Sequence, residues 1–323
     1  MTDPLTAVLA KAGWAEATRA PLAGDASSRR YLRLSRMGRT AILMQAPIAT
    51  QADRDSLAAF VRVGSHLAGL GLSAPAMIAA DPGAGVLLLE DFGDATLARL
   101  LPDDPATARI AYQQACDVTL HLAMAPLPDW IARPDIAAQA AMIALTLDFL
   151  PPGESGDLEP LLARALAAHA DGAPVLSLRD YHADNLIWLP HRHGTARIGI
   201  LDFQDAVALP LGYDLASLVD DPRRDVPALW RAALIGRFAA AHDLPRDHAE
   251  ARIATLSLLR NLRILGVFHR LATAGGKPQY RQFLPRTGAL IDRAVAHPAL
   301  CALRPAVARL RALTASWAGG AAA

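Results

Sequence analysis

The feature that most constrains the fold is a polar loop that runs into two short apolar stretches, all within residues 178–205. These residues read LRDYHADNLIWLPHRHGTARIGILDFQD. Asp180 stands five positions before Asn185, and Asp202 follows directly on the second apolar stretch. The apolar stretches have the length and composition of buried strands, and the polar residues between them are typical of a turn. We therefore expect a loop, a strand, a turn and a second strand in this segment.

The order aspartate, asparagine, aspartate is typical of phosphoryl transfer from ATP. In such enzymes one carboxylate accepts the proton of a substrate hydroxyl, while the asparagine and the second aspartate hold the Mg²⁺ that bridges the phosphates. A hydroxyl is a poor nucleophile without a base nearby, and the charge of the triphosphate must be neutralised. On this interpretation Asp180 is the catalytic base, Asn185 turns toward the ion, and Asp202 is exposed where its strand ends.

A purely structural interpretation of the same three residues is also open. Aspartate and asparagine favour turns and strand ends, so each residue taken alone could be a turn former or a cap. Motif matches of this kind also produce false positives. The three residues together, with two apolar strands between them, favour the catalytic interpretation.

The segment resembles the aminoglycoside phosphotransferase and choline kinase superfamily, whose catalytic loop reads HGDLHPGN and whose metal strand reads IDWEDA or similar. It is more similar to the anomeric sugar kinases of that superfamily, which phosphorylate N-acetylmuramate and N-acetylglucosamine. Leu178–Pro190 is similar to their loop, Leu201–Ala206 to their metal strand, and Tyr213–Pro227 to the stretch that follows. The resemblance extends from Ser27–Leu34 to Gly276–Arg286.

This resemblance implies an α+β, protein-kinase-like fold with two lobes. A small β-rich lobe would cover residues 1–92 and bind the nucleotide, and a large helical lobe would cover residues 93–323 and carry the catalytic loop and the sugar site. The resemblance also implies a sugar kinase that uses ATP and Mg²⁺ in the recycling of cell-wall peptidoglycan. An aminoglycoside or choline-like small-alcohol kinase and a catalytically inactive nucleotide-binding regulator are the alternatives.

The order of expected elements agrees with such a fold. After an N-terminal helix, the patterns predict strands over residues 30–34 and 40–44 and a helix over residues 53–70. Two more strands, over residues 77–80 and 86–89, are joined by the turn sequence DPGAG. Beyond residue 94 the pattern becomes helical, with long Ala- and Leu-rich segments near 105–125, 158–170, 226–242, 248–272 and 287–315.

The nucleotide side of the chain departs from the usual kinase pattern. Residues 90–93 mark the expected hinge, where backbone groups near Glu90 and Phe92 would hold the adenine. Protein kinases grip the phosphates with a lysine on the third strand that pairs with a helix glutamate. Here the matching strand, TAILMQAP, has Met44 or Gln45 at that place, and the helix that follows has no glutamate. The usual pair is therefore absent.

Two explanations compete for the missing lysine. The chain could be an inactive nucleotide binder, or the loop from Asp25 to Arg30 could hold the phosphates. In that loop, hydroxyl, amide and guanidinium donors would come from Ser27, Ser28, Arg29 and Arg30. Because decay after a loss of function would spread to the metal ligands, the intact catalytic loop favours an active enzyme.

Several polar residues are candidates for the sugar side of the site. His182 could orient the backbone of the catalytic loop or touch the sugar, and Asp205 could support the metal loop. Arg260 and Asn261 interrupt an apolar helix, and such groups need partners. They could pair internally with the acidic residues of 220–225, or they could face the substrate. The arginines of the helical part favour a neutral or anionic sugar over a polycation.

Composition argues against a nucleic-acid-binding protein and against a membrane protein. A net charge of +1 and a sequence pI near 7.9 give no bulk attraction to nucleic acid, and no obligate protein partner is implied. The N-terminal residues lack a basic leader, and no apolar stretch is long enough for a membrane span, so we expect a cytoplasmic protein with a small-molecule substrate. Cys116 and Cys301 both lie in apolar helical patterns and are expected to be reduced and buried.

Overall fold

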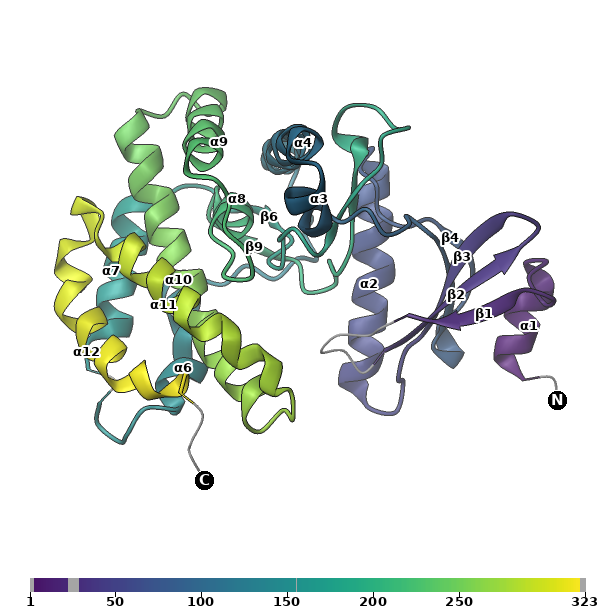
Figure 1. Ribbon diagram of the computed structural model, residues 1–323, viewed down its shortest axis with the longest axis horizontal. Helices are drawn as coiled ribbons and strands as arrows, with labels where there is room; N and C mark the ends of the chain where they lie inside the picture. Colours follow the sequence, from purple (N-terminus) through teal and green to yellow (C-terminus); the bar gives the residue numbers. More distant parts are fainter. Residues whose placement is uncertain (1–2, 23–28, 155, 320–323) are drawn as a thin grey trace. The chain divides into compact units, whose positions relative to one another are not determined.

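The structure is a computed structural model that describes residues 3–22, 29–154 and 156–319. The chain divides into two compact units, which we describe separately. The first unit comprises Met1–Val118 and Ala183–Ala206, and the second comprises Thr119–His182 and Val207–Ala323. The first contains an antiparallel sheet and the second is mostly helical, so the expected α+β class is confirmed (Figure 1). The lobe boundary expected between residues 92 and 93 stays a prediction.

The first unit is built on a five-stranded sheet with the order β1-β2-β3-β5-β4, in which all neighbours are antiparallel. Its strands are β1 (Thr18–Pro21), β2 (Arg30–Arg36), β3 (Arg39–Gln45), β4 (Met77–Asp81) and β5 (Val86–Glu90). Four of them lie where the sequence predicts strands. The exception is β1, which is four residues long and exposed throughout, so it shows no apolar alternation that a sequence could reveal.

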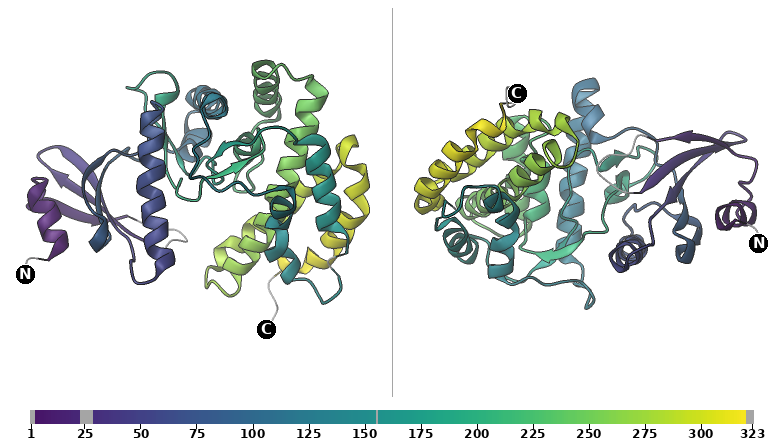
Figure 2. Two further views of the ribbon diagram at one scale, coloured as in Figure 1. Left: turned by 180° about the vertical axis from the view of Figure 1, so that it is seen from behind. Right: turned by 90° about the horizontal axis from the view of Figure 1, so that it is seen from below.

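Two helices accompany this sheet. α1 (Pro4–Lys11) packs against β4 and β5 (Figure 2) and joins Trp14 in one apolar core with the strands. α2 (Gln51–Gly69) begins with a capping box in which Thr50 and Asp53 bond to each other's backbone amides. It ends before Gly71, whose φ of +74° suits glycine at a helix C-terminus. Phe60 belongs to the buried stripe of α2.

A separate two-stranded hairpin completes the first unit. β7 (Leu186–Trp188) pairs with β8 (Ile198–Ile200) in the antiparallel register Leu186 to Ile200. These are the two strands that the sequence predicts between the loop and Asp202. Ser73, which follows α2, forms a bridge with Gly199 and so ties the hairpin to the rest of the unit. α3 (Leu97–Asp103) also belongs to this unit, and α4 (Pro105–Met124) is divided between the two units.

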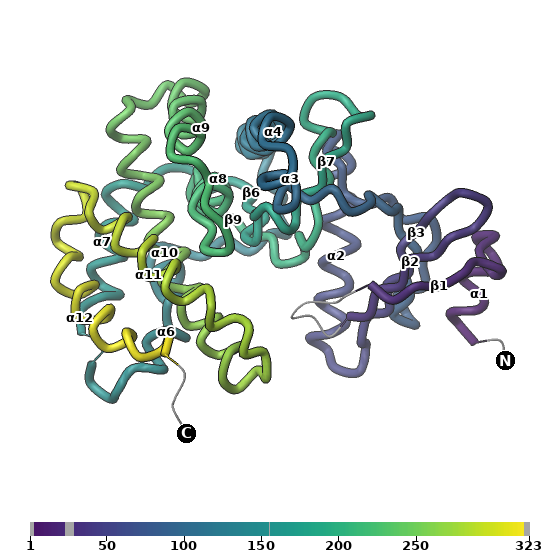
Figure 3. The backbone as a smooth tube through the Cα atoms, in the orientation of Figure 1, coloured from purple at the N-terminus to yellow at the C-terminus, as the bar shows by residue number. Residues whose placement is uncertain are grey.

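The second unit is organised around α10 (Arg246–Ala272), whose path Figure 3 traces. This helix is buried along most of its length. Its closest packing partner is α11, and the approach of α6 is so close that a Cβ at Gly266 would lie 2.5 Å from Thr146 Oγ1. The remaining elements are α5 (Ile136–Ala140), α6 (Ala144–Asp148), α7 (Leu158–His169), α8 (Tyr213–Val219), α9 (Ala228–Ala241), α11 (Leu284–Val295), α12 (Arg304–Thr314) and the paired strands β6 (Val175–Ser177) and β9 (Val207–Leu209).

The C-terminal region differs from the sequence prediction in one respect. The helical stretch expected over residues 287–315 is broken into α11, a 3-10 helix over Pro298–Leu303, and α12. Proline lacks the N–H that a continuing helix needs, so Pro298 ends the first helix. The break also changes the periodicity around Cys301, which is exposed. The expectation of a buried thiol was therefore wrong for Cys301 and is confirmed for Cys116. Across the described ranges, no helix has the length and apolar character that a membrane span requires.

Candidate active site

The loop that carries Asp180 extends from β6 in the second unit. The side chain of Asp180 is 27% exposed, so its carboxylate can be reached from solvent. The preceding residue, Arg179, has a φ of +68°, in the left-handed region that residues with large side chains rarely adopt. Backbone in such a conformation persists only where neighbouring groups hold it.

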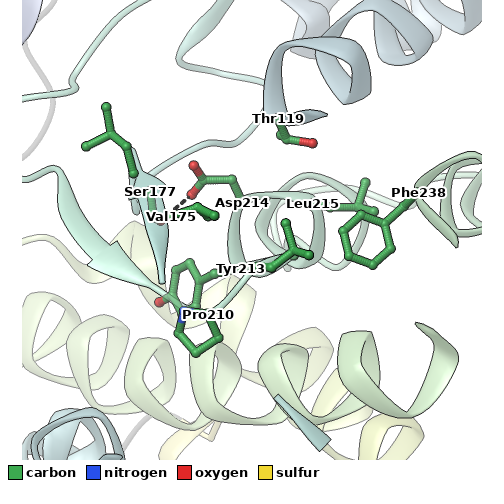
Figure 4. Close-up of a pocket in the computed structure, with 11 residues that line it drawn as sticks. Thr119, Val175, Ser177, Pro210, Tyr213, Asp214, Leu215 and Phe238 are labelled. Atoms are coloured by element: carbon green, nitrogen blue, oxygen red, sulfur yellow. Dashed lines mark hydrogen bonds between the residues drawn. The ribbon is translucent and has the colours of Figure 1, made fainter. Parts of the chain in front are cut away.

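Asp214, the second residue of α8, supplies those neighbouring groups. Its Oδ1 accepts a hydrogen bond from Ser177 Oγ at 2.7 Å (Figure 4). The same oxygen accepts a second hydrogen bond from the Arg179 amide at 3.0 Å. Its Oδ2 accepts from the Leu178 amide at 2.7 Å. Burial raises the pKa of Asp214 to about 6, against the opposite effect of these three hydrogen bonds. Asp214 therefore anchors the backbone immediately before Asp180.

A small pocket surrounds this anchor (Figure 4). Its lining includes Ser177, Tyr213, Asp214 and Phe238, and Asp180 is not part of it. The pocket is thus a gap in the packing behind the loop, and the accessible carboxylate of Asp180 lies outside it.

The charges around Asp180 set its protonation state. Arg263 of α10 places Nη1 3.8 Å from Asp180 Oδ1. Burial acts to raise the pKa of Asp180, but the positive charge of Arg263, with smaller contributions from its neighbours His182 and Arg260, outweighs burial, and the pKa lies below its usual range. Asp180 is therefore an ionised carboxylate at neutral pH, which is the form that can accept a proton.

Arg260 and His182 are buried in this part of the second unit. Arg260 has no exposed surface and donates from Nη2 to Asp221 Oδ2 at 2.9 Å, and Arg223 donates to the same oxygen at 2.9 Å. Burial acts to raise the pKa of Asp221, but the charges of Arg223, His182 and Arg260 outweigh burial and hold that pKa well below its usual range.

Asn261, which is also fully buried, donates from Nδ2 to the carbonyls of Asp220 at 3.2 Å and Ser257 at 3.0 Å. Internal pairing, one of the two alternatives open from the sequence, is thus what the structure has for Arg260 and Asn261. Direct substrate contact by Arg260, Asn261 or His182 stays a prediction.

In the first unit, the hairpin brings Asn185 and Asp202 together. Because Leu186 pairs with Ile200, Asn185 and Leu201 face each other at the open end, and the Leu201 amide donates to the Asn185 carbonyl at 2.9 Å. Asp202 follows at once, is exposed, and has a φ of +57°. One carboxylate and one amide oxygen at the end of a hairpin are a donor set that suits Mg²⁺, which takes oxygen ligands and leaves positions for substrate phosphates.

In the part of the chain that the structure describes, no group of three or more His, Cys, Asp or Glu side chains is arranged to hold a metal ion. Asp205 is exposed on the loop that follows Asp202. The roles of Asn185, Asp202 and Asp205 stay predictions.

The residues expected to hold the phosphates are placed only in part. Ser27 and Ser28 lie outside the described residues. Arg30 is exposed at the beginning of β2, whereas Arg29 is only 8% exposed and donates from Nη1 to Gln204 Oε1 at 3.0 Å. Met44, at the place of the missing lysine, is completely buried.

Arg29 also donates from Nη2 to Ser56 Oγ at 2.8 Å. Sequence reasoning missed Gln204 and Ser56, because they lie 175 and 27 residues from Arg29 and neither residue type signals such a partner.

The hinge residues pack against the turn of the β7–β8 hairpin. Glu90 forms an ion pair with Arg192, and its amide donates to the Ala76 carbonyl at 2.8 Å. The guanidinium of Arg192 lies 5.2 Å from the centre of the Phe92 ring. That ring covers Gly199, where a Cβ would lie only 2.6 Å from it. Glu90 and Phe92 are thus fixed in place within the first unit, and their contact with a nucleotide stays a prediction.

Comparison with known proteins identifies a family model and relatives that match this chain. The family model described as "Phosphotransferase enzyme family" matches residues 18–254. The N-acetylmuramate/N-acetylglucosamine kinase of Caulobacter vibrioides is 36% identical over 340 aligned residues, which cover 92% of this chain and 93% of that protein.

Solved structures show the same fold. A choline/ethanolamine kinase family protein from Mesorhizobium loti has a TM-score of 0.63 at 17% identity, covering 95% of this chain and 97% of its own. An aminoglycoside phosphotransferase in a ternary complex with ADP and hygromycin B has a TM-score of 0.61 at 15% identity, covering 91% and 99%. These likenesses confirm the expected protein-kinase-like fold. With a family model that matches most of its length and a relative that is similar nearly end to end, the chain belongs to the phosphotransferase enzyme family.

Proposed function

We propose that this phosphotransferase is an ATP-dependent kinase that phosphorylates the anomeric hydroxyl of N-acetylmuramate or N-acetylglucosamine. The observation that carries the proposal is the match, over 92% of the chain, to a relative named for both sugars. The candidate site is consistent with it, because a solvent-accessible, ionised aspartate lies on an anchored loop.

Asp180 is the base in this proposal. It accepts the proton of the sugar hydroxyl as the oxygen attacks the terminal phosphorus of ATP, and the bond from that phosphorus to the oxygen bridging it to ADP breaks. The positive charges around Asp180 lower its pKa and so make it a weak base. An anomeric hydroxyl is more acidic than an ordinary alcohol because the ring oxygen withdraws electrons, so a weak base suits an anomeric acceptor better than an ordinary one.

Asn185 and Asp202 would hold Mg²⁺ at the open end of the hairpin. When bound, the ion supplies neutralisation of the phosphate charge. The support for this assignment is the register of the hairpin and the oxygen donors that it places together. The binding of ATP rests on the family and on the ADP found in the aminoglycoside phosphotransferase of the same fold.

The biological role that we propose is the salvage of amino sugars released from peptidoglycan, in the cytoplasm, where ATP is available. Its support is again the name of the relative together with the charge of the helical part of the chain. Arg263, next to Asp180, would meet a neutral or anionic sugar without the repulsion that a polycation would feel.

A panel of acceptors tests this function. ATP consumption is measured with N-acetylmuramate, N-acetylglucosamine, glucose, choline and kanamycin, and the product is examined by phosphorus NMR. We expect turnover with the two N-acetylated sugars and a phosphate on the anomeric carbon. The methyl glycoside of N-acetylglucosamine, in which the anomeric oxygen is blocked, is the matched control and should be inert. Equal turnover of the glycoside would refute the anomeric assignment, and turnover of kanamycin or choline alone would refute the sugar assignment.

A further inference from the structure

Arg29 connects three segments of the first unit that are distant in sequence. The side chain is almost fully buried, and Nη1 donates to Gln204 Oε1 at 3.0 Å. Nη2 donates to Ser56 on α2, to Oγ at 2.8 Å and to the carbonyl at 3.3 Å. The guanidinium also lies 5.4 Å from the centre of the Phe60 ring, one turn further along α2. The start of β2, α2 and the loop after β8 thus meet at one cation.

The cation fixes the orientation of Gln204. A guanidinium can only donate hydrogen bonds, so the oxygen of the Gln204 amide must face Arg29 and its nitrogen must face the other way. That nitrogen donates to Asp202 Oδ1 at 2.8 Å. Gln204 is therefore a directed bridge from the arginine to the carboxylate.

The backbone of Asp202 needs such support. Its φ of +57° lies in the left-handed region, which costs free energy in a residue other than glycine. The next residue, Phe203, is 1% exposed and stacks on Phe60 with ring centres 4.8 Å apart. α2 therefore supports the Asp202 loop twice, by the ring of Phe60 and by the chain of hydrogen bonds that begins at Ser56.

No cation from β3 serves this purpose. Met44 is completely buried, and the register places it between Tyr31 on β2 and Leu87 on β5. In protein kinases the lysine on this strand links the sheet to a helix glutamate and positions the phosphates. Here the link between the sheet and α2 is made by Arg29, from the beginning of β2.

We propose that Arg29 is a positioning residue that holds Asp202, through Gln204, in the conformation that binds a Mg²⁺–nucleotide complex. With 8% of its surface exposed and two nitrogens committed to Gln204 and Ser56, Arg29 acts through its neighbours and does not itself grip the phosphates. The inference rests on the nucleotide and metal part of the proposed function, and it is independent of which sugar is the acceptor.

The test compares nucleotide binding with and without Mg²⁺. Binding of a non-hydrolysable ATP analogue is measured by calorimetry over a series of Mg²⁺ concentrations for the wild type, Gln204→Leu, Arg29→Lys and Arg29→Ala. Gln204→Leu keeps the size of the side chain and removes both hydrogen bonds of the bridge. The control is Gln51→Leu, which removes a Gln–Asp hydrogen bond of the same 2.8 Å length on the exposed surface of α2.

We expect Gln204→Leu to raise the Mg²⁺ concentration needed for half-maximal binding about tenfold. The loss of one hydrogen bond to a charged group changes an equilibrium constant by about that factor. Affinity without Mg²⁺ should stay as in the wild type, because the bridge acts on the metal ligand. Arg29→Lys should cause a smaller loss of the same kind, since lysine lacks the fork that reaches two partners. Gln51→Leu should behave as the wild type.

Three results would overturn the inference. Equal losses with and without Mg²⁺ in the Arg29 variants would mean that Arg29 contacts the phosphates directly. An unchanged Mg²⁺ dependence in Gln204→Leu would mean that the bridge does not position Asp202. If Arg29→Ala fails to fold, Gln204→Leu decides alone.

A wild type that binds no nucleotide would refute the proposed function and the inference together. Normal nucleotide binding without turnover of any sugar would refute only the proposed function.

Discussion

Asp214→Asn is the substitution that best tests how the catalytic loop is held. The two side chains have the same shape, but asparagine offers one oxygen where aspartate offers two. Asp214 accepts from Ser177 Oγ, the Leu178 amide and the Arg179 amide. In the variant, the new NH₂ group must face one of these donors, and a buried amide that loses its acceptor costs about 1–3 kcal/mol.

The substitution also removes a charge that burial makes expensive. The pKa of Asp214 is raised from 3.8 to about 6 in the folded protein. A difference of roughly 2 pKa units corresponds to about 3 kcal/mol at 1.36 kcal/mol per unit. For a carboxyl with a raised pKa, the folded state holds more protons than the unfolded state between these two values, so stability falls as pH rises from about 4 to 6. At pH 7, removing the desolvated charge therefore stabilises Asp214→Asn by about as much as the lost hydrogen bond destabilises it.

The decisive measurement is therefore the pH dependence and not the stability at one pH. Urea unfolding of wild type and Asp214→Asn is measured from pH 4 to 7. We expect the difference in free energy of unfolding, wild type minus variant, to fall by about 2–3 kcal/mol across that range. Asp292→Asn, at an exposed ion pair with Arg311, is the control and should show no such change. A difference between wild type and Asp214→Asn that is the same at every pH would refute the account.

The same variant has a kinetic consequence. A loop backbone with a missing acceptor no longer holds Arg179 in its left-handed conformation, and the carboxylate of Asp180 moves with it. Since a displacement near 1 Å costs about 100-fold in rate, we expect kcat to fall by about 10- to 100-fold with little change in the Michaelis constant for ATP. Ser177→Ala, which removes one donor and keeps the charge, should give a smaller loss of kcat.

Further predictions follow from the proposed roles. Asp180→Asn should lower kcat by about 100-fold or more while nucleotide binding persists, as general-base contributions indicate; wild-type turnover in steady-state kinetics would refute the base. Asp202→Ala should abolish the Mg²⁺ dependence of ATP binding measured by calorimetry. If ATP binds equally well with and without Mg²⁺ in the wild type, and Asp202→Ala changes neither affinity, the protein is an inactive relative. Arg29→Ala with Arg30→Ala should raise the Michaelis constant for ATP about tenfold at fixed Mg²⁺, whereas Met44→Ala should lower the free energy of unfolding by the cost of a cavity, about 2–5 kcal/mol. An unchanged ATP constant in the double arginine variant would mean that Arg29 does not position Asp202 and that Arg30 does not contact the phosphates.

The parts of the site that the sequence predicts are those specified by local patterns. Asn185 and Asp202 flank two apolar strands, and because these strands are adjacent in the chain, their pairing brings the two residues together without any long-range information. The long helices α7, α9 and α10 could be predicted for the same reason, since their apolar periodicity is local, whereas the short helices α5, α6 and α8 were not predicted. The break at Pro298 is an exception, because the apolar periodicity of residues 287–315 continues across a proline that cannot donate the N–H of a continuing helix.

The remaining parts depend on contacts between distant residues. Arg29 and Gln204 are 175 positions apart, and nothing in either neighbourhood indicates that they meet. β1 was missed because its four exposed residues gain their strand conformation only by pairing with β2. In both cases the tertiary structure decides what the local sequence leaves open.

Two of the buried aspartates of the second unit, Asp214 and Asp221, show why the pH response of the catalytic loop should come from Asp214. Asp214 is surrounded by neutral donors, so desolvation dominates and raises its pKa to about 6. Asp221 is equally buried, but Arg223 and Arg260 donate to it, and their charges drive its pKa in the opposite direction. As pH falls from neutral, Asp214 takes up a proton first while Asp221 stays ionised. The protonated carboxyl is a poorer acceptor for the Leu178 and Arg179 amides, so the loop that positions Asp180 should loosen near pH 6, above the range in which Asp180 itself titrates.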